Sequence, residues 1–176
     1  MGVFHRKTPK AELAPAVVTA LDLAKGERVL AFAVDDFTRA QVIATTYAIA
    51  VVTSAAERTL RRRWLSVDAG VWDPEMAILT VTWADAQPAG RWSMPDQPTL
   101  LPETVRERVQ ASVVLSVRLN LGDRRSGRVA IRQDFATGEL ISQTILGSST
   151  SPDDPEVQAQ VKAALAHLRD QVGLPA

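Results

Sequence analysis

Arginine is the residue type with the clearest capacity for binding chemistry in this chain. One group consists of Arg58 and the run Arg61 to Arg63. A second group consists of Arg118, Arg124, Arg125, Arg128 and Arg132. Because guanidinium groups bind carboxylates and phosphates through two parallel hydrogen bonds, each group indicates a surface for an anion or a partner. The simpler alternative is the solvated outer face that antiparallel sheets commonly have.

Strand alternation limits what these arginines can do together. In an extended segment, Arg62 points to the face opposite Arg61 and Arg63, which leaves few cations on one side to follow a nucleic-acid backbone. In the second group, three arginines alternate with apolar residues and are predicted to share a polar face with neighbouring hydroxyl and amide side chains. The expected members of that face are Arg118, Arg128, Arg132, Ser116, Asn120, Ser142 and Thr144.

Four tryptophans lie within one stretch of alternating apolar and polar residues. Trp83 and Trp92 share a face with other large apolar residues and are expected to fill a core. Trp64 and Trp72 each lie at a strand end near a break, Trp72 after one expected at Ala69-Gly70, and there an exposed ring would mark a contact surface. The candidate partner-binding residues are therefore Arg61, Arg63, Trp64, Trp72, Arg118, Arg128 and Arg132.

Residues for catalysis or metal binding are scarce. The chain has no cysteine, and its only histidines are His5 and His167. No glycine-rich phosphate-binding motif occurs. We therefore predict no catalytic residue, no metal site and no cofactor.

Carboxylate pairs are the remaining candidates for chemistry. Asp35-Asp36 and Asp153-Asp154 fall at turn or cap positions, where Asp is favoured for hydrogen bonding to the backbone. A hydrolase would need Asp36, Asp73 or Asp134 to be brought together by the fold, and this alternative stays open.

Composition indicates a globular protein of the cytoplasm. Hydrophobic residues make up 46% of the 176, and 20 basic residues balance 20 acidic ones. Such a balance disfavours nucleic acid as a partner. No apolar run is long enough to span a bilayer. Weak peripheral contact with a membrane and the oligomeric state are left open.

Periodicity predicts an α+β order of elements. A frayed tail over residues 1–14 precedes a helix at 15–24, and a second helix begins at Pro102 and ends near Ser112. Asp154 caps a long last helix. The expected strands cover residues 30–34, 41–52, 59–67, 78–83 and 91–94, followed by a three-strand meander over 115–121, 129–135 and 140–146.

The middle of the chain resembles a known family. Val42-Ile43-Ala44-Thr45-Thr46, an arginine-rich strand leading into Trp64-Leu65-Ser66-Val67, then Trp72-Asp73-Pro74-Glu75, Leu79-Thr80-Val81 and the Pro102 helix follow in that order. This order is similar to bacterial PH-like domains of GRAM type and covers residues 26–114. The whole chain also resembles uncharacterised actinobacterial proteins. The resemblance implies a bent antiparallel β-barrel closed by a helix, and it brings no catalytic residues.

Together these patterns predict two parts and a binding function. Residues 15–114 are expected to form a PH-like β domain with flanking helices, and 115–176 a meander and helix packed on it. We expect a non-enzymatic cytoplasmic binding or scaffolding module for another protein. The alternatives are a nucleic-acid-binding protein that uses its arginines and an exposed tryptophan, and the carboxylate hydrolase.

Overall fold

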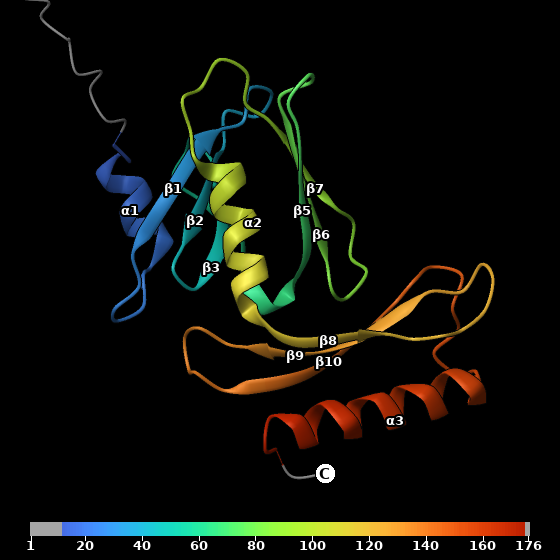
Figure 1. The fold of residues 1–176 in the computed structure, drawn as a ribbon. Helices are drawn as coiled ribbons and strands as arrows, with labels where there is room; N and C mark the ends of the chain where they lie inside the picture. The colour runs from blue at the N-terminus through green and yellow to red at the C-terminus, as the bar shows by residue number, and fades with distance from the viewer. Residues whose placement is uncertain (1–11, 175–176) are drawn as a thin grey trace, which may run out of the picture.

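Three helices and three antiparallel sheets make up residues 12–174, the part of the chain that this computed structural model describes (Figure 1). The first sheet has the order β1-β2-β3-β4. Its strands are β1 Val29–Val34, β2 Gln41–Thr45, β3 Ala48–Val52 and β4 Arg58–Arg63. Helix α1, Pro15–Leu21, covers the outer face of this sheet by packing Val17 and Leu21 against Ile43, Ala50 and Val52.

The second sheet has the order β5-β6-β7 and faces the first across a shared core. Its strands are β5 Val67–Asp73, β6 Ile78–Trp83 and β7 Gly90–Ser93. Helix α2, Leu101–Ser112, packs against both sheets and buries Leu101, Val105 and Val109 in that core. Neither sheet closes, so the barrel expected from the sequence is not present among the described residues.

The third sheet follows α2 directly and has the order β10-β9-β8. Its strands are β8 Val113–Arg118, β9 Gly127–Gln133 and β10 Leu140–Leu146. Helix α3, Pro155–Gln171, covers the face of this sheet that points away from the first two sheets (Figure 1). Leu168 of α3 is buried with Val129 and Ile131 of β9, so the apolar side of the meander is used to hold the helix.

Two expected strands differ from the observed ones. The run 41–52 is a hairpin rather than one strand, because the Thr45 hydroxyl accepts hydrogen bonds from the amides of Tyr47 and Ala48 and folds the chain back there. The expected strand over 59–67 ends at Arg63, after which Trp64–Ser66 forms a 3-10 turn, η1.

The break expected at Ala69-Gly70 is absent. Strand β5 continues through Gly70, where an added Cβ would lie 2.5 Å from Cγ1 of Val105. The glycine therefore permits the close approach of α2 to the sheet, and it does not mark the end of a strand.

The remaining predicted elements are found within a few residues of their expected bounds. The helix expected over 15–24 ends at Leu21, and the last helix begins after Asp154, whose carboxylate accepts a hydrogen bond from the amide of Glu156. Most of the tail expected over residues 1–14 lies outside the described residues, as does His5.

Candidate functional site

Strand register divides the third sheet into two chemically different faces. Val129 and Ile131 point toward α3, so Arg128 and Arg132, which alternate with them on β9, point toward the first two sheets. Arg118 lies directly opposite Arg128 on β8, and Ile145 lies opposite it on β10. We call this side of the third sheet the arginine face. Ser142 and Thr144 were expected on it, but their register opposite Ile131 and Val129 places them on the α3 side.

Arg132 is buried at the junction between the third sheet and the rest of the protein. It is 1% exposed, and its guanidinium donates to the carbonyl oxygens of Trp64, at 2.8 Å, and Val67, at 2.9 Å, and to the hydroxyl of Ser112. Burial, together with the nearby charge of Arg128, lowers the pKa of Arg132 to about 10, and Asp68 offsets only part of this shift. This arginine was a candidate partner-binding residue, but its donors are occupied inside the protein.

Arg128 and Arg118 lie at the accessible part of the arginine face. Arg128 forms an ion pair with Asp68 of β5. Arg118 is exposed and has no hydrogen-bond or ion-pair partner among residues 12–174. A cavity of about 370 Å³ is lined by both arginines together with Ser116, Ala130 and Ile145.

A second cavity adjoins this one. Its volume is about 340 Å³, and it shares Arg118, Arg128 and Ile145 with the first while adding Asp68 and Gly147. We refer to the two cavities together as the Arg118 groove. Asp68 is the one carboxylate that lines the groove, whereas Arg118, Arg128 and the buried Arg132 line it with guanidinium groups, so the groove retains a positive charge at Arg118. Nothing in the sequence marked Asp68 as part of this site, because it is a single acidic residue at the start of β5.

In the first arginine group, Arg58 donates to the carbonyl of Leu21, and the run Arg61 to Arg63 is occupied by internal ion pairs. Arg61 contacts Glu27 at 2.6 Å, Arg62 pairs with Asp85 and stacks on the ring of Trp83, and Arg63 pairs with Asp134. The register places Arg62 on the face opposite Arg61 and Arg63, in agreement with the alternation expected from the sequence. None of the three presents an unneutralised cation to a ligand.

Glu27 is the most enclosed of these carboxylates. Burial raises its pKa, but hydrogen bonds from Arg61, Thr45 and the amide of Ala24 together outweigh burial and hold the pKa below its usual value of 4.5. The group therefore stays ionised and fixes the segment before β1 to β2 and β4.

The two tryptophans considered as contact residues are not exposed platforms. Trp64 is 1% exposed, and its indole nitrogen donates to the carbonyl of Thr45 at 2.9 Å. Trp72 is half-buried against the core shared by the first two sheets. The assignment of Trp64 to a contact surface is therefore wrong: it fills the core between those sheets.

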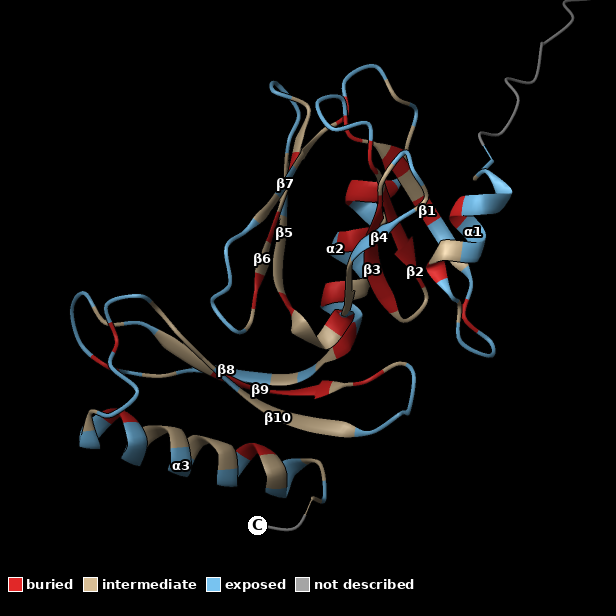
Figure 2. Cartoon of the chain, turned by 180° about the vertical axis from the view of Figure 1, so that it is seen from behind, coloured by how far each residue is buried: buried red, intermediate tan, exposed pale blue. Residues whose placement is uncertain are grey.

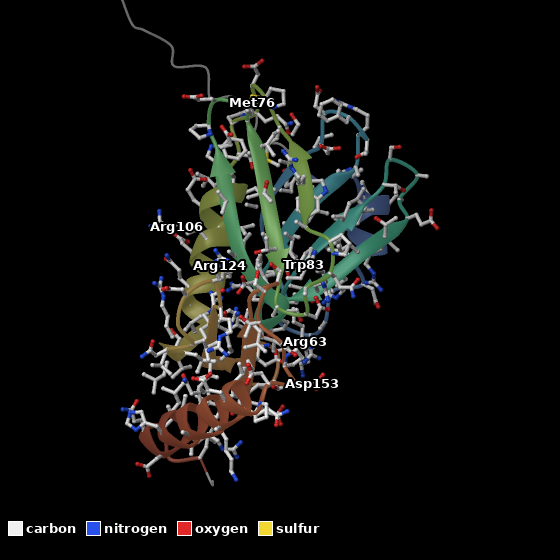
Figure 3. All side chains as sticks on the ribbon, turned by 90° about the vertical axis from the view of Figure 1, so that its right-hand side faces the viewer. Arg63, Met76, Trp83, Arg106, Arg124 and Asp153 are labelled. Carbon is white, nitrogen blue, oxygen red and sulfur yellow. The ribbon has the colours of Figure 1, made fainter. Side chains whose placement is uncertain are left out.

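Of the carboxylates considered for a hydrolase, Asp73 and Asp134 lie apart, and Asp36 forms an ion pair with Arg39. Asp73 accepts hydrogen bonds from the amides of Glu75 and Met76 at one end of the β5–β6 hairpin, whereas Asp134 pairs with Arg63. Met76 and Arg63 lie at opposite ends of this part of the protein (Figure 3). Within residues 12–174 no group of three or more His, Asp or Glu side chains could hold a metal ion.

A smaller polar cavity of about 180 Å³ lies at the other edge of the junction. It is lined by Ser66, Asp85 and Gln143, among others. The side-chain amide nitrogen of Gln143 donates to the carbonyl of Leu65 at 2.8 Å, while its buried oxygen has no hydrogen-bond partner. Sequence reasoning did not single out Gln143, because no pattern predicts that a glutamine on β10 reaches η1.

Comparison of the chain with protein-family models, with curated proteins and with solved structures finds no match. Among the described helices, none combines the length and the apolar character that crossing a bilayer requires. The functional argument therefore depends on the geometry of the Arg118 groove.

Proposed function

We propose that this protein is a non-enzymatic cytoplasmic binding module that recognises an acidic segment of another protein through the Arg118 groove. The observation that carries this proposal is the isolation of Arg118. Each of Arg61, Arg62, Arg63, Arg125 and Arg128 has a carboxylate partner. Arg118 lines both cavities of the groove without such a partner. A carboxylate from outside would complete the pairing that the chain itself leaves open.

We also propose that residues 26–114 are a PH-like domain. The order of a four-stranded antiparallel sheet, a three-stranded antiparallel sheet and a helix packed against both supports this assignment. In this proposal the third sheet and α3 are an addition that supplies the binding surface, since the Arg118 groove is lined mainly by residues of that sheet.

Nucleic acid is the weaker candidate. A groove that follows a phosphate backbone needs several cations on one surface. The run of three arginines that suggested such a surface is neutralised by Glu27, Asp85 and Asp134. A single unpaired arginine in the groove suits one or two carboxylates better than a chain of phosphates.

The proposal is tested by affinity purification from cells that express the tagged protein. Arg118→Glu reverses the charge in the groove, and Arg124→Glu is the matched control. Arg124 is an exposed arginine in the β8–β9 connection that lines neither cavity (Figure 3). We expect the wild type and Arg124→Glu to capture the same proteins, and Arg118→Glu to lose them. Capture that survives Arg118→Glu, or that depends on nucleic acid and is lost on nuclease treatment, would refute the proposal.

A further inference from the structure

Strand β8 is an open edge of the third sheet. The order β10-β9-β8 leaves no strand beyond β8 among the described residues. The strand is also the more exposed of the two edges, with Val114 41% and Val117 38% exposed, whereas most of β10 is half-buried (Figure 2). An edge of this kind presents unpaired backbone groups to a further strand.

The backbone groups that face outward can be identified from the ladder. The amide of Leu119 donates to the carbonyl of Gly127, and the pairing continues with Val117 opposite Val129 and Leu115 opposite Ile131. In an antiparallel ladder, the backbone N–H and C=O groups of successive residues point alternately to the two neighbouring sides. Leu115, Val117 and Leu119 therefore bond to β9, and the backbone groups of Ser116 and Arg118 point to the open edge. The side chains of Ser116 and Arg118 both line the groove.

We infer that the acidic segment binds as an added antiparallel strand on β8, with its carboxylates in the Arg118 groove. This inference rests on the proposed function and specifies its mode of binding. Residues of the segment that lie opposite Ser116 and Arg118 share the arginine face, because directly opposed residues of an antiparallel pair point to the same side. Those positions carry acidic side chains, and the alternate positions carry apolar ones that meet Leu115 and Val117.

The register therefore predicts the chemistry of the partner. The segment alternates acidic and apolar residues, and the residues that supply carboxylates to the groove also supply the amides that bond to β8. This mode of recognition combines main-chain hydrogen bonds with side-chain specificity at alternate positions.

A second copy of the chain is a less suitable occupant of the same edge. Antiparallel pairing of two β8 strands would bring a second Arg118 toward the first, and like charges in opposed cross-strand positions are destabilising. The groove already contains Arg128 directly opposite Arg118, and its one lining carboxylate, Asp68, pairs with Arg128.

The test uses the full chain and a labelled peptide, Thr-Val-Asp-Val-Asp-Val-Thr. One derivative carries methyl groups on the backbone nitrogens of both Asp residues, and another carries them on those of the first and last Val residues. A third peptide has the same composition, but its two Asp residues are adjacent. We expect methylation at Asp to weaken binding at least about tenfold, methylation at Val to have little effect, and the rearranged peptide to bind weakly.

Hydrogen exchange gives an independent readout. Binding of the parent peptide should slow exchange at the amides of Ser116 and Arg118, which an anion held only by side chains would not do. Ser116→Pro removes one outward amide without touching the bonds to β9, and it should weaken binding of the parent peptide.

The outcomes separate the two proposals. If Arg118→Glu abolishes binding but neither N-methylation nor hydrogen exchange responds, strand addition is wrong and anion recognition stands. If Arg118→Glu leaves binding unchanged, or no peptide binds, both are wrong. A dimer in which the amides of Ser116 and Arg118 are protected without peptide would overturn strand addition in favour of self-pairing.

Discussion

At the scale of single residues, Arg132 has the opposite role to the one that its place in an arginine group suggested. Its guanidinium donates hydrogen bonds to the carbonyl oxygens of Trp64 and Val67 and to the hydroxyl of Ser112. These acceptors belong to three different elements, η1, β5 and α2. Buried acceptors that lose their donor each cost roughly 1–3 kcal/mol. Arg132 therefore ties the third sheet to the rest of the protein, while Arg118 has no carboxylate partner among residues 12–174 and remains available to bind.

Replacing Arg132 tests this structural role. Arg132→Met keeps much of the side-chain volume but removes every donor, and we expect it to lower the free energy of unfolding by roughly 2–4 kcal/mol. Arg124→Met, at an exposed position, should change it by less than about 0.5 kcal/mol. Urea unfolding curves of both variants give the comparison, and equal small effects would mean that the buried hydrogen bonds contribute little.

Glu27 makes stability depend on pH. Because its pKa is lower in the folded protein than the usual 4.5, the unfolded chain binds more protons in the interval between the two values. The contribution of the ionised group is complete above about pH 5 and is lost as the pH falls through the folded pKa. We expect the stability difference between wild type and Glu27→Gln to be largest near neutral pH and to narrow in acid.

Unfolding titrations at several pH values measure this difference. The same comparison is made in a protein that also carries Arg61→Met, which removes the cation that contacts Glu27 at 2.6 Å. In that background the effect of Glu27→Gln on the free energy of unfolding should change less between neutral and acid pH. A difference that is constant from pH 7 to pH 3 would show that Glu27 does not titrate with a lowered pKa.

At the scale of elements, sequence pattern was most informative where the period was clear. The alternation of Leu79, Val81 and Trp83 with threonines predicted β6, and the apolar stripe after Asp154 predicted α3. The hairpin of β2 and β3 was missed, because the turn at Thr46-Tyr47 contains no Gly, Pro, Asn or Asp and is stabilised instead by the hydroxyl of Thr45. Gly70 was misread, because sequence does not reveal that Val105 lies above it.

The candidate site was predicted only in part for a related reason. Alternation placed Arg118, Arg128 and Arg132 on one face, and the register confirms this. Which of them is buried, paired or free depends on Asp68 and on the carbonyls of η1 and β5, which are distant in sequence. Such tertiary partners leave no local signal.

Helix α3 is predicted to stabilise the third sheet through its apolar stripe. Leu168→Ala removes a side chain that is 3% exposed and packs with Val129 and Ile131, so we expect a loss of roughly 2–4 kcal/mol in unfolding free energy. Lys162→Ala, on the exposed side of the same helix, is the control. Thermal or urea unfolding of both variants measures the effect. Equal stabilities would show that α3 is not packed on the sheet in solution.

At the scale of the whole molecule, the first two sheets with α2 and the third sheet with α3 meet at a polar junction. The contacts across it include the ion pairs Arg63–Asp134 and Arg128–Asp68, the hydrogen bonds of Arg132, and the bond from Gln143 to Leu65. The Arg118 groove lies beside this junction and is shaped by it, because Asp68 of β5 fixes Arg128 next to Arg118. Binding at the groove thus depends on how both parts are held together.

The most direct measurement of the central claim, that Arg118 recognises an acidic segment, is a charge exchange between protein and ligand. Affinities are measured for wild type and Arg118→Glu with the peptide Thr-Val-Asp-Val-Asp-Val-Thr and with its counterpart that has Lys at both Asp positions. We predict that Arg118→Glu weakens binding of the Asp peptide at least about tenfold. The same variant should bind the Lys peptide more tightly than the wild type does. Equal affinity of wild type and Arg118→Glu for the Asp peptide would contradict the claim.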